Sequence, residues 1–252
     1  MIDAPRAKKR SRSSAERSGM ERKMTDISKM TEKDLCFMFD HTNLKAYASS
    51  EDIRKLCAEA KEYGFRMVAI NPVHTAMCRE ILSGTDVHVG PCVSFPLGQN
   101  TIEEKCTETL LAISQGADEI DYVTNLTAVK DGRWDYIERE MRTIADICRS
   151  AGVISKVIFE NCYLTDDEKI ELCRVARRVR PTFVKTSTGF GTGGATVHDV
   201  ELMYKHVAGE VLVKAAGGIR DADTFLAMVR AGARRIGTSA GVTIIEELAR
   251  RL

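Results

Sequence analysis

The segment Val211–Arg220, VLVKAAGGIR, holds the pattern that decides the fold. Its first five residues form a short apolar run with one lysine near the end, which is typical of a buried parallel strand. The glycine pair Gly217-Gly218 then predicts a turn, and the amphipathic stretch behind it predicts a helix. A strand, a glycine turn and a helix in this order make one β/α unit.

The same unit recurs along the chain from about residue 35. The expected strands are Leu35–Asp40, Arg66–Asn71, Val87–Phe95, Glu119–Thr124, Ser155–Glu160, Thr182–Thr186, Val211–Ala215 and Arg235–Gly237. Eight strands, each followed by a helix, predict a single (β/α)₈ TIM barrel of the α/β class. A doubly wound open sheet is the alternative, because periodicity alone does not prove closure. A G-x-G-x-x-G dinucleotide fingerprint would favour the open sheet, and none opens the first unit.

Helical periodicity fills the gaps between the expected strands. The clearest apolar stripes are Ile53, Leu56, Cys57 and Ala60 in one helix and Ile102, Cys106, Leu110 and Ile113 in another. Glycines stand where helix ends are expected, at Gly64, Gly116, Gly152 and Gly232.

Four consecutive strands carry charge where branched aliphatic residues would be usual. They are Asp121, Lys156, Lys185 and Lys214. Any one of them could be a paired structural residue, but four buried charges cost several kcal/mol per ion unless paired, and such groups are usually retained for a site. A lysine beside another cation in a partly dry pocket loses its proton more easily and can attack a carbonyl. The pattern therefore predicts an imine-forming site.

Glycine-rich turns follow the last two strands. Gly217 and Gly218 lie in the first turn, and Gly237 and Ser239 lie in the second. Both precede helices whose first N–H groups could hold an anion, and barrels often bind phosphate there. Taken singly, each could be a plain tight turn. The turn at Gly189 could add further donors.

Charge divides the chain unevenly. Residues 1–30 hold nine Lys and Arg against four Asp and Glu, a net charge of +5, which leaves −4 for the rest of a chain whose total is +1. We interpret residues 1–30 as a disordered basic tail and residues 31–252 as the barrel domain. The run Lys8–Arg12 could be an import or RNA-contacting patch, although a solvated tail is the simpler interpretation. A mildly acidic barrel is a poor nucleic-acid surface, so no nucleic-acid partner is expected.

Other features of the composition exclude several classes. No apolar run is long enough to span a membrane, and the basic start has no apolar core of a secretory signal behind it. Eight cysteines without a C-x-x-C pair, and five scattered histidines, predict reduced thiols and no metal site. A cytoplasmic protein is expected.

Seven motifs in order resemble the deoxyribose-phosphate aldolase family from about Asp40 to the end of the barrel. They are Asp40-His41-Thr42, Phe95–Gly98 (FPLG), Gly116–Asp121 (GADEID), Lys156-Val157-Ile158, Phe183–Gly189 (FVKTSTG), Lys214–Arg220 (KAAGGIR) and Gly237-Thr238-Ser239. The resemblance implies a class I, Schiff-base aldolase, a lyase that works without metal or organic cofactor. It also implies reversible cleavage of 2-deoxy-D-ribose 5-phosphate to D-glyceraldehyde 3-phosphate and acetaldehyde in deoxyribose phosphate catabolism.

The resemblance also implies roles for particular residues. Lys185 would form the imine, and the neighbouring Lys214 would lower the pKa of Lys185. Asp121 would move protons in a polar network with Lys156. Asp40 and Thr42 would lie near the sugar hydroxyl. The residues implied for phosphate are Gly189, Gly217, Gly218, Gly237 and Ser239. A homo-oligomer, either a dimer or a tetramer, is compatible with this family.

Three features depart from the family pattern. Phe190 stands where some members have a lysine near the phosphate, which implies weaker phosphate binding. The sequence ends Arg250-Arg251-Leu252 without the terminal tyrosine of some members, and the basic tail has no counterpart. Two rival functions stay open. One is another imine-forming aldolase or transaldolase, and the other is a phosphosugar-binding or nucleic-acid-associated module without catalysis.

Overall fold

The computed structural model describes residues 29–251. Residues 1–28 lie outside this described part. The expected tail, with its basic run Lys8–Arg12, therefore stays a prediction.

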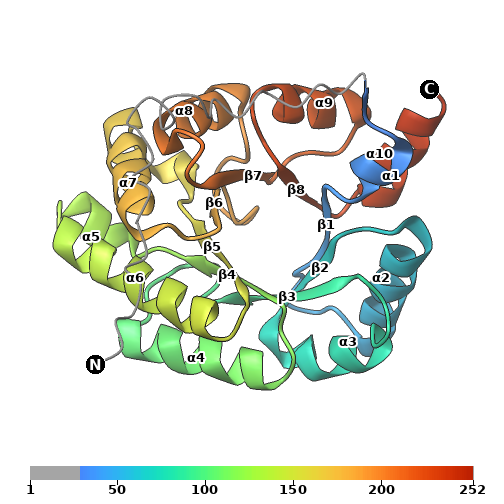
Figure 1. Ribbon diagram of the computed structural model, residues 1–252, viewed down its shortest axis with the longest axis horizontal. Coiled ribbons are helices and arrows are strands. Elements are labelled where there is room, and N and C mark those ends of the chain that lie inside the picture. Colours follow the sequence, from blue (N-terminus) through green and yellow to red (C-terminus); the bar gives the residue numbers. More distant parts are fainter. Residues whose placement is uncertain (1–28, 252) are drawn as a thin grey trace, which may run out of the picture.

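Eight parallel strands close into a barrel in the order β1-β2-β3-β4-β5-β6-β7-β8. The strands are β1 Phe39–Asn43, β2 Met67–Ile70, β3 His88–Val93, β4 Glu119–Val123, β5 Ile154–Ile158, β6 Phe183–Lys185, β7 Leu212–Ala216 and β8 Arg235–Thr238. Pairing of β1 with β8 completes the ring, as Figure 1 shows. The TIM barrel prediction is confirmed, and the open-sheet alternative is wrong.

Helices surround the ring of strands (Figure 1). They are α1 Glu32–Cys36, α2 Ser50–Tyr63, α3 Thr75–Ile81, α4 Ile102–Ser114, α5 Leu126–Lys130, α6 Trp134–Ser150, α7 Asp166–Val179, α8 Val197–Val207, α9 Ala222–Arg230 and α10 Gly241–Ala249. Two short 3₁₀ turns, η3 Pro72–His74 and η4 Asn161–Tyr163, precede α3 and α7. None of the described helices is long and apolar enough to cross a membrane.

Each strand separates two environments, because successive side chains point to opposite faces. In β4, Ile120 and Tyr122 are buried in the apolar layer beneath the helices. Glu119 and Asp121 alternate with them and form ion pairs inside the barrel. The apolar layer therefore holds the helices on the ring and leaves the interior available for charged groups.

The first expected strand, Leu35–Asp40, is wrong at its start. Leu35 and Cys36 belong to the short helix α1, and β1 begins only at Phe39. Thr31 starts the helix with a capping box, in which its hydroxyl accepts a hydrogen bond from the Asp34 N–H and the Asp34 carboxylate accepts one from the Thr31 N–H. Two buried apolar residues were thus misinterpreted, although the capping signal Thr31-x-x-Asp34 precedes them.

The apolar stripe expected in α4 is wrong at Leu110, whereas Ile102 is buried and Ile113 packs against the core. Leu110 is exposed, whereas Lys105, Thr109 and Ala112 are buried together with Ile102. Lys105 can be buried because its ammonium group contacts the Glu140 carboxylate of α6 at 2.6 Å and the Val123 carbonyl at 2.7 Å. A buried ion pair therefore places Lys105 on the inner face of the helix, where the sequence led us to expect apolar residues alone. The stripe of α2, from Ile53 to Ala60, is confirmed.

Candidate active site

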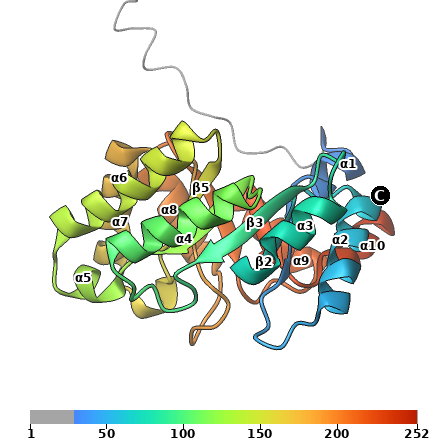
Figure 2. The ribbon, with the colours of Figure 1, turned by 90° about the horizontal axis from the view of Figure 1, so that it is seen from below.

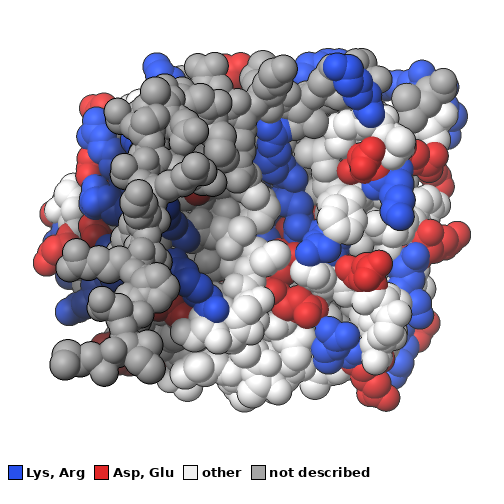
Figure 3. Space-filling view, viewed as in Figure 1, with Lys and Arg blue, Asp and Glu red and all other residues white. Residues whose placement is uncertain are grey.

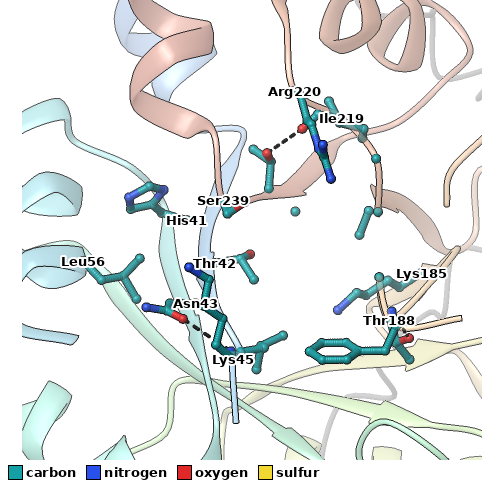
Figure 4. Close-up of a pocket in the computed structure, with 18 of the residues that line it drawn as sticks. His41, Thr42, Asn43, Lys45, Leu56, Lys185, Thr188, Ile219, Arg220 and Ser239 are labelled. Atoms are coloured by element: carbon teal, nitrogen blue, oxygen red, sulfur yellow. Dashed lines mark hydrogen bonds between the residues drawn. The ribbon is translucent and has the colours of Figure 1, made fainter. Parts of the chain in front are cut away.

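A cavity of about 450 Å³ lies at the carboxyl end of the barrel strands. Loops after β1, β6, β7 and β8 surround it, and Figure 2 shows that the connecting loops extend from one end of the barrel, opposite α1. Seven residues expected at the site line this cavity: Thr42, Lys185, Gly189, Gly217, Gly218, Gly237 and Ser239. Figure 4 shows Lys185 pointing into the space that faces Thr42 and Ser239.

Lys185 lies at the floor of the cavity because it is the last residue of β6. It pairs in register with Lys214 of β7, so the two side chains enter the barrel side by side. The ammonium groups of both residues contact the same carboxylate oxygen, Asp121 Oδ2, at 2.8 Å for Lys185 and 2.7 Å for Lys214. Of the three interior lysines described, Lys185 lines the cavity, whereas Lys156 and Lys214 are fully buried beneath it.

Asp121 joins all three lysines. Its second oxygen, Oδ1, accepts a hydrogen bond from the Lys156 ammonium group at 2.6 Å. Register explains this contact, since Asp121 of β4 is paired with Lys156 of β5. The structure thus brings together the four charged residues that the sequence singled out.

Electrostatics at Asp121 and Lys185 follow from these contacts. Burial favours the neutral acid, but the charges of Lys156, Lys185 and Lys214 outweigh it and hold the pKa of Asp121 well below its usual range. Burial also acts to lower the pKa of Lys185, yet the Asp121 carboxylate outweighs burial, so the pKa of Lys185 is raised. The pKa of Lys185 therefore lies above the ordinary lysine value, contrary to the expectation that the charge of Lys214 brings it below that value. Two lysines share one carboxylate oxygen, and the attraction to that oxygen exceeds their mutual repulsion.

Asp40 does not line the cavity, contrary to the position expected near the sugar hydroxyl. Its carboxylate is fully buried, forms an ion pair with Lys214, and accepts hydrogen bonds from the Arg235 guanidinium, with a contact of 2.7 Å. Thr42, two residues on, does line the cavity, and its hydroxyl donates to the Asp40 carbonyl. Asp40 therefore holds the Lys214 ammonium group in place through this buried ion pair.

Sequence reasoning missed two charged members of the interior. Glu119 contacts Lys156 at 2.5 Å and Arg235 at 2.8 Å, and both Glu119 and Arg235 are buried. A signal existed, since Glu119 stands two residues before Asp121 and Arg235 stands two before Gly237, which puts each pair on one strand face. Four cations, Lys156, Lys185, Lys214 and Arg235, thus face three carboxylates, Asp40, Glu119 and Asp121.

The turns after β6 and β7 pack directly against each other. A Cβ atom on Gly194 would lie 2.2 Å from the Gly217 carbonyl oxygen, so the two backbones approach too closely for any larger residue. Gly218 has φ +80°, but the space where its Cβ would lie is open. This arrangement leaves Gly218 facing free space at the cavity.

Gly237 has a different environment from Gly218. A Cβ atom there would lie 3.1 Å from Cε of Lys214. Gly237 therefore gives room to the interior lysine, a role that the sequence did not indicate. The helix behind this turn, α10, begins without a side-chain cap at Ala240, so its first N–H groups are suited to an anion.

Basic residues at the cavity mouth were also missed. Lys45, Lys55 and Arg220 line the cavity, and Figure 4 shows Arg220 and Lys45 at different sides of it. They favour an anionic ligand. Phe190 lines the same cavity, with its ring edge-on to Phe95 at 5.4 Å between centroids.

Other ligand classes find less support in the described residues. No group of His, Cys, Asp and Glu among residues 29–251 could hold a metal ion. All eight cysteines are free thiols in the structure. On the part of the face in Figure 3 that is not grey, Lys and Arg lie among Asp and Glu.

Fold and site together define a class of protein. A lysine at the floor of a cavity, paired with a buried carboxylate at the carboxyl ends of barrel strands, is typical of a lyase that works through an imine.

Comparison with known proteins then defines the family. Residues 35–245 match the model of the DeoC/LacD family aldolase. Deoxyribose-phosphate aldolase of Lactobacillus acidophilus is 55% identical over 89% of this chain and 94% of its own length. The enzyme of that name from Bacteroides thetaiotaomicron is 53% identical over 87% of this chain and 92% of its own length. The tetrameric deoxyribose phosphate aldolase of Aeropyrum pernix has the same fold, with a TM-score of 0.82 and 33% identity over 88% of this chain and 94% of that one. This chain belongs to the DeoC/LacD family of aldolases.

Proposed function

We propose that this aldolase reversibly cleaves 2-deoxy-D-ribose 5-phosphate to D-glyceraldehyde 3-phosphate and acetaldehyde through an imine on Lys185. The observation that carries the proposal is the position of Lys185. Its ammonium group lies at the floor of the cavity, and the Asp121 carboxylate is 2.8 Å away. The names of the relatives support the same substrate.

Imine formation begins when Lys185 loses a proton and its amine attacks the substrate carbonyl carbon. Because Asp121 raises the pKa of Lys185, the free amine is a minor form at neutral pH and the rate of attack should rise with pH. The carbinolamine then loses water to give a cationic imine, and cleavage of the carbon–carbon bond leaves an enamine. Asp121 lies close enough to Lys185 to accept and return protons at these stages.

Lys156 and Lys214 act beneath the reacting atoms. Each donates a hydrogen bond to one oxygen of Asp121, so the carboxylate is fixed and kept ionised until it takes a proton. We assign these two lysines and Asp40 to positioning, since all three are fully buried.

The phosphate is assigned to the end of the cavity formed by the turns after β7 and β8. Gly218 leaves open space there, α10 offers uncapped N–H groups, and the Arg220 side chain lines the same region. Anions bind well at such helix starts. Gly189, Gly217 and Ser239 complete the proposed phosphate site, and Thr42 lies across the cavity on the sugar side.

Substitutions at Gly218 and Gly237 should distinguish an effect on phosphate binding from an effect on the reaction at Lys185. Gly218→Asn should reduce kcat/KM for the phosphorylated sugar about tenfold or more, because a side chain that tolerates the positive φ would fill the open space beside the backbone N–H groups. Activity with unphosphorylated 2-deoxyribose should change much less. Gly237→Val should reduce activity with both substrates alike, since its side chain would press on Lys214. Kinetics of the two variants with both sugars check this, and an equal loss on both sugars for Gly218→Asn would contradict the phosphate assignment.

Product analysis tests the substrate proposal itself. The enzyme is incubated with acetaldehyde and D-glyceraldehyde 3-phosphate, and formation of 2-deoxy-D-ribose 5-phosphate is the expected result. A transaldolase or an aldolase for another phosphosugar would not use acetaldehyde as donor. No product and no imine would favour a binding module without catalysis.

Three further proposals concern the chain as a whole. We propose a cytoplasmic protein that forms a homo-oligomer, either a dimer or a tetramer, and the tetrameric Aeropyrum pernix relative supports the second form. We also propose that residues 31–252 act as the aldolase domain without the basic tail, because the matched family positions begin at residue 35.

Removal of residues 1–28 should therefore leave turnover essentially intact. Their composition is polar and basic, and they hold no matched family position. Thermal unfolding and kcat/KM of the shortened chain check this expectation. A loss of more than about 1 kcal/mol in the free energy of unfolding would show that the segment packs on the barrel.

A further inference from the structure

A second hollow lies at the opposite, amino end of the barrel strands. Its volume is about 250 Å³. The residues around it are Phe37, Arg66, Arg79, Thr85, Asp86, Val87, His88 and Asp118. Among them, His88 begins β3, and a quarter of its side chain is exposed. This hollow is separate from the cavity above Lys185.

A continuous series of short contacts joins the hollow to Lys185. The imidazole Nδ1 of His88 lies 2.8 Å from Glu119 Oε1, and Glu119 Oε2 lies 2.5 Å from the Lys156 ammonium nitrogen. Lys156 in turn donates to Asp121 Oδ1 at 2.6 Å. Asp121 Oδ2 accepts from Lys185 at 2.8 Å. Every contact joins two groups that can carry a proton.

The burial of its members shows which end of this series of contacts reaches solvent. Glu119, Lys156 and Asp121 are fully buried, and Lys185 is 3% exposed. His88 is the member that reaches solvent. A substrate in the cavity above Lys185 would cover Lys185 and close that side to water. Asp121 would then reach solvent at the amino-end hollow through Lys156, Glu119 and His88.

We propose that His88, Glu119 and Lys156 form a proton route between solvent at the amino end of the barrel and the Asp121–Lys185 pair. The proposal rests on the proposed function, because the proton that it carries is the one that Asp121 takes from the imine's neighbouring carbon. His88 and Glu119 touch no substrate atom and act through Asp121. They are positioning and relay residues.

The transfer balances at every group. Starting with protonated Asp121, the Lys156 ammonium group gives a proton to Glu119 Oε2 and becomes an amine. Asp121 turns its carboxyl group and gives its proton to that amine, which restores the ammonium ion. Glu119 turns likewise and gives its proton to the free lone pair of His88 Nδ1, and the imidazolium releases a proton from Nε2 to water, which leaves the Nδ1–H tautomer. Exchange of protons between His88 and water then restores the Nε2–H tautomer. One proton has left Asp121, and the reverse sequence returns one.

Charged groups of both signs surround His88 in the hollow. They are Glu119 of β4, Arg66 beside β2, Arg79 of α3, Asp86 before β3, and Asp118 before β4. Arg79 is paired with Asp118 at 3.2 Å. Arg66 lies 3.7 Å from Glu119 Oε1, farther than the 2.8 Å of His88. The imidazole is therefore the nearest titratable partner of Glu119 on the solvent side.

Exchange of deuterium tests the route. The enzyme is incubated in ordinary water with acetaldehyde deuterated at its methyl group, and loss of deuterium is followed by NMR. His88→Asn can keep a hydrogen bond to Glu119 but cannot take up a proton, so the rate of exchange should fall about tenfold or more. Borohydride trapping on Lys185 should stay at the wild-type level. His198→Asn is the control, because His198 is paired with Asp166 on the surface.

Chemical rescue separates a relay from a merely structural role. In His88→Ala, added imidazole should enter the hollow and restore most of the lost exchange. Exchange in His88→Asn at the wild-type rate would overturn the route, and so would a loss that imidazole fails to restore. The proposed function is tested apart from this, since its failure would appear as a wild-type enzyme that traps no acetaldehyde at all.

Discussion

Lys185→Arg is expected to abolish both turnover and the trapping of acetaldehyde by borohydride. A guanidinium group stays protonated throughout the usable pH range and cannot form the imine. Its positive charge can still bind Asp121, which now accepts from Lys185 at 2.8 Å. The fold should therefore survive, and circular dichroism and thermal unfolding check that it does.

Lys130→Arg is the matched control for this variant. Lys130 lies outside the cavity, with its half-exposed side chain paired with Glu168. It should retain turnover and trapping. A Lys185→Arg protein that still turns over substrate would contradict the assignment of the nucleophile.

Asp121→Asn should have the second large effect, on turnover and on stability together. The amide cannot move protons, so kcat should fall about 10²–10⁴-fold, the usual contribution of a general acid–base group. It also leaves three buried lysines without their shared carboxylate, and breaking such a pair costs about 3–5 kcal/mol of folding free energy. Steady-state kinetics and denaturant unfolding measure the two losses.

The pH dependence of trapping should shift in opposite directions in two variants. Asp121 raises the pKa of Lys185, so Asp121→Asn should let borohydride trapping occur at lower pH than in the wild type. Lys214→Met removes a cation that shares Asp121 Oδ2, which strengthens the hold of Asp121 on Lys185 and should move trapping to higher pH. Shifts in the same direction would show that the shared oxygen does not set the pKa of Lys185.

The same contacts determine how stability changes with pH. The pKa of Asp121 is lower in the folded state than in the unfolded state, so its contribution is present above about pH 4 and is lost as pH falls toward the folded value. The pKa of Lys185 is raised, so its contribution is present below about pH 10 and is lost as pH rises through the folded value. Between these limits the two residues should stabilise the barrel fully.

Much of the barrel could be predicted because its signals are local. Each strand is a short apolar run next to a helix. Lys185 and Lys214 can be recognised because they are charged residues within such apolar runs. Parallel neighbours in a ring then bring consecutive strands together, so Lys185 and Lys214 had to lie side by side. The family motifs coincide with these positions.

The sequence could not predict which charged residues form ion pairs across the barrel. Arg235 contacts Asp40, 195 residues earlier, and no local pattern encodes that pairing. The same limit explains why the burial of Lys105 in α4 was not predicted. Lys105 is buried because its ammonium group is paired with Glu140 of α6. The raised pKa of Lys185 also depends on the contact that Lys185 and Lys214 both make with Asp121 Oδ2. The spacing of residues along the sequence does not indicate this contact.

Borohydride reduction in the presence of acetaldehyde, followed by peptide mass mapping, tests the central claim most directly. Reduction converts an imine into a stable secondary amine, so the modified lysine can be located in the sequence. We expect the added two-carbon group on Lys185, with Lys156 and Lys214 unmodified. An adduct on Lys156 or Lys214, or no adduct on any of the three, would contradict the assignment of Lys185 as the nucleophile.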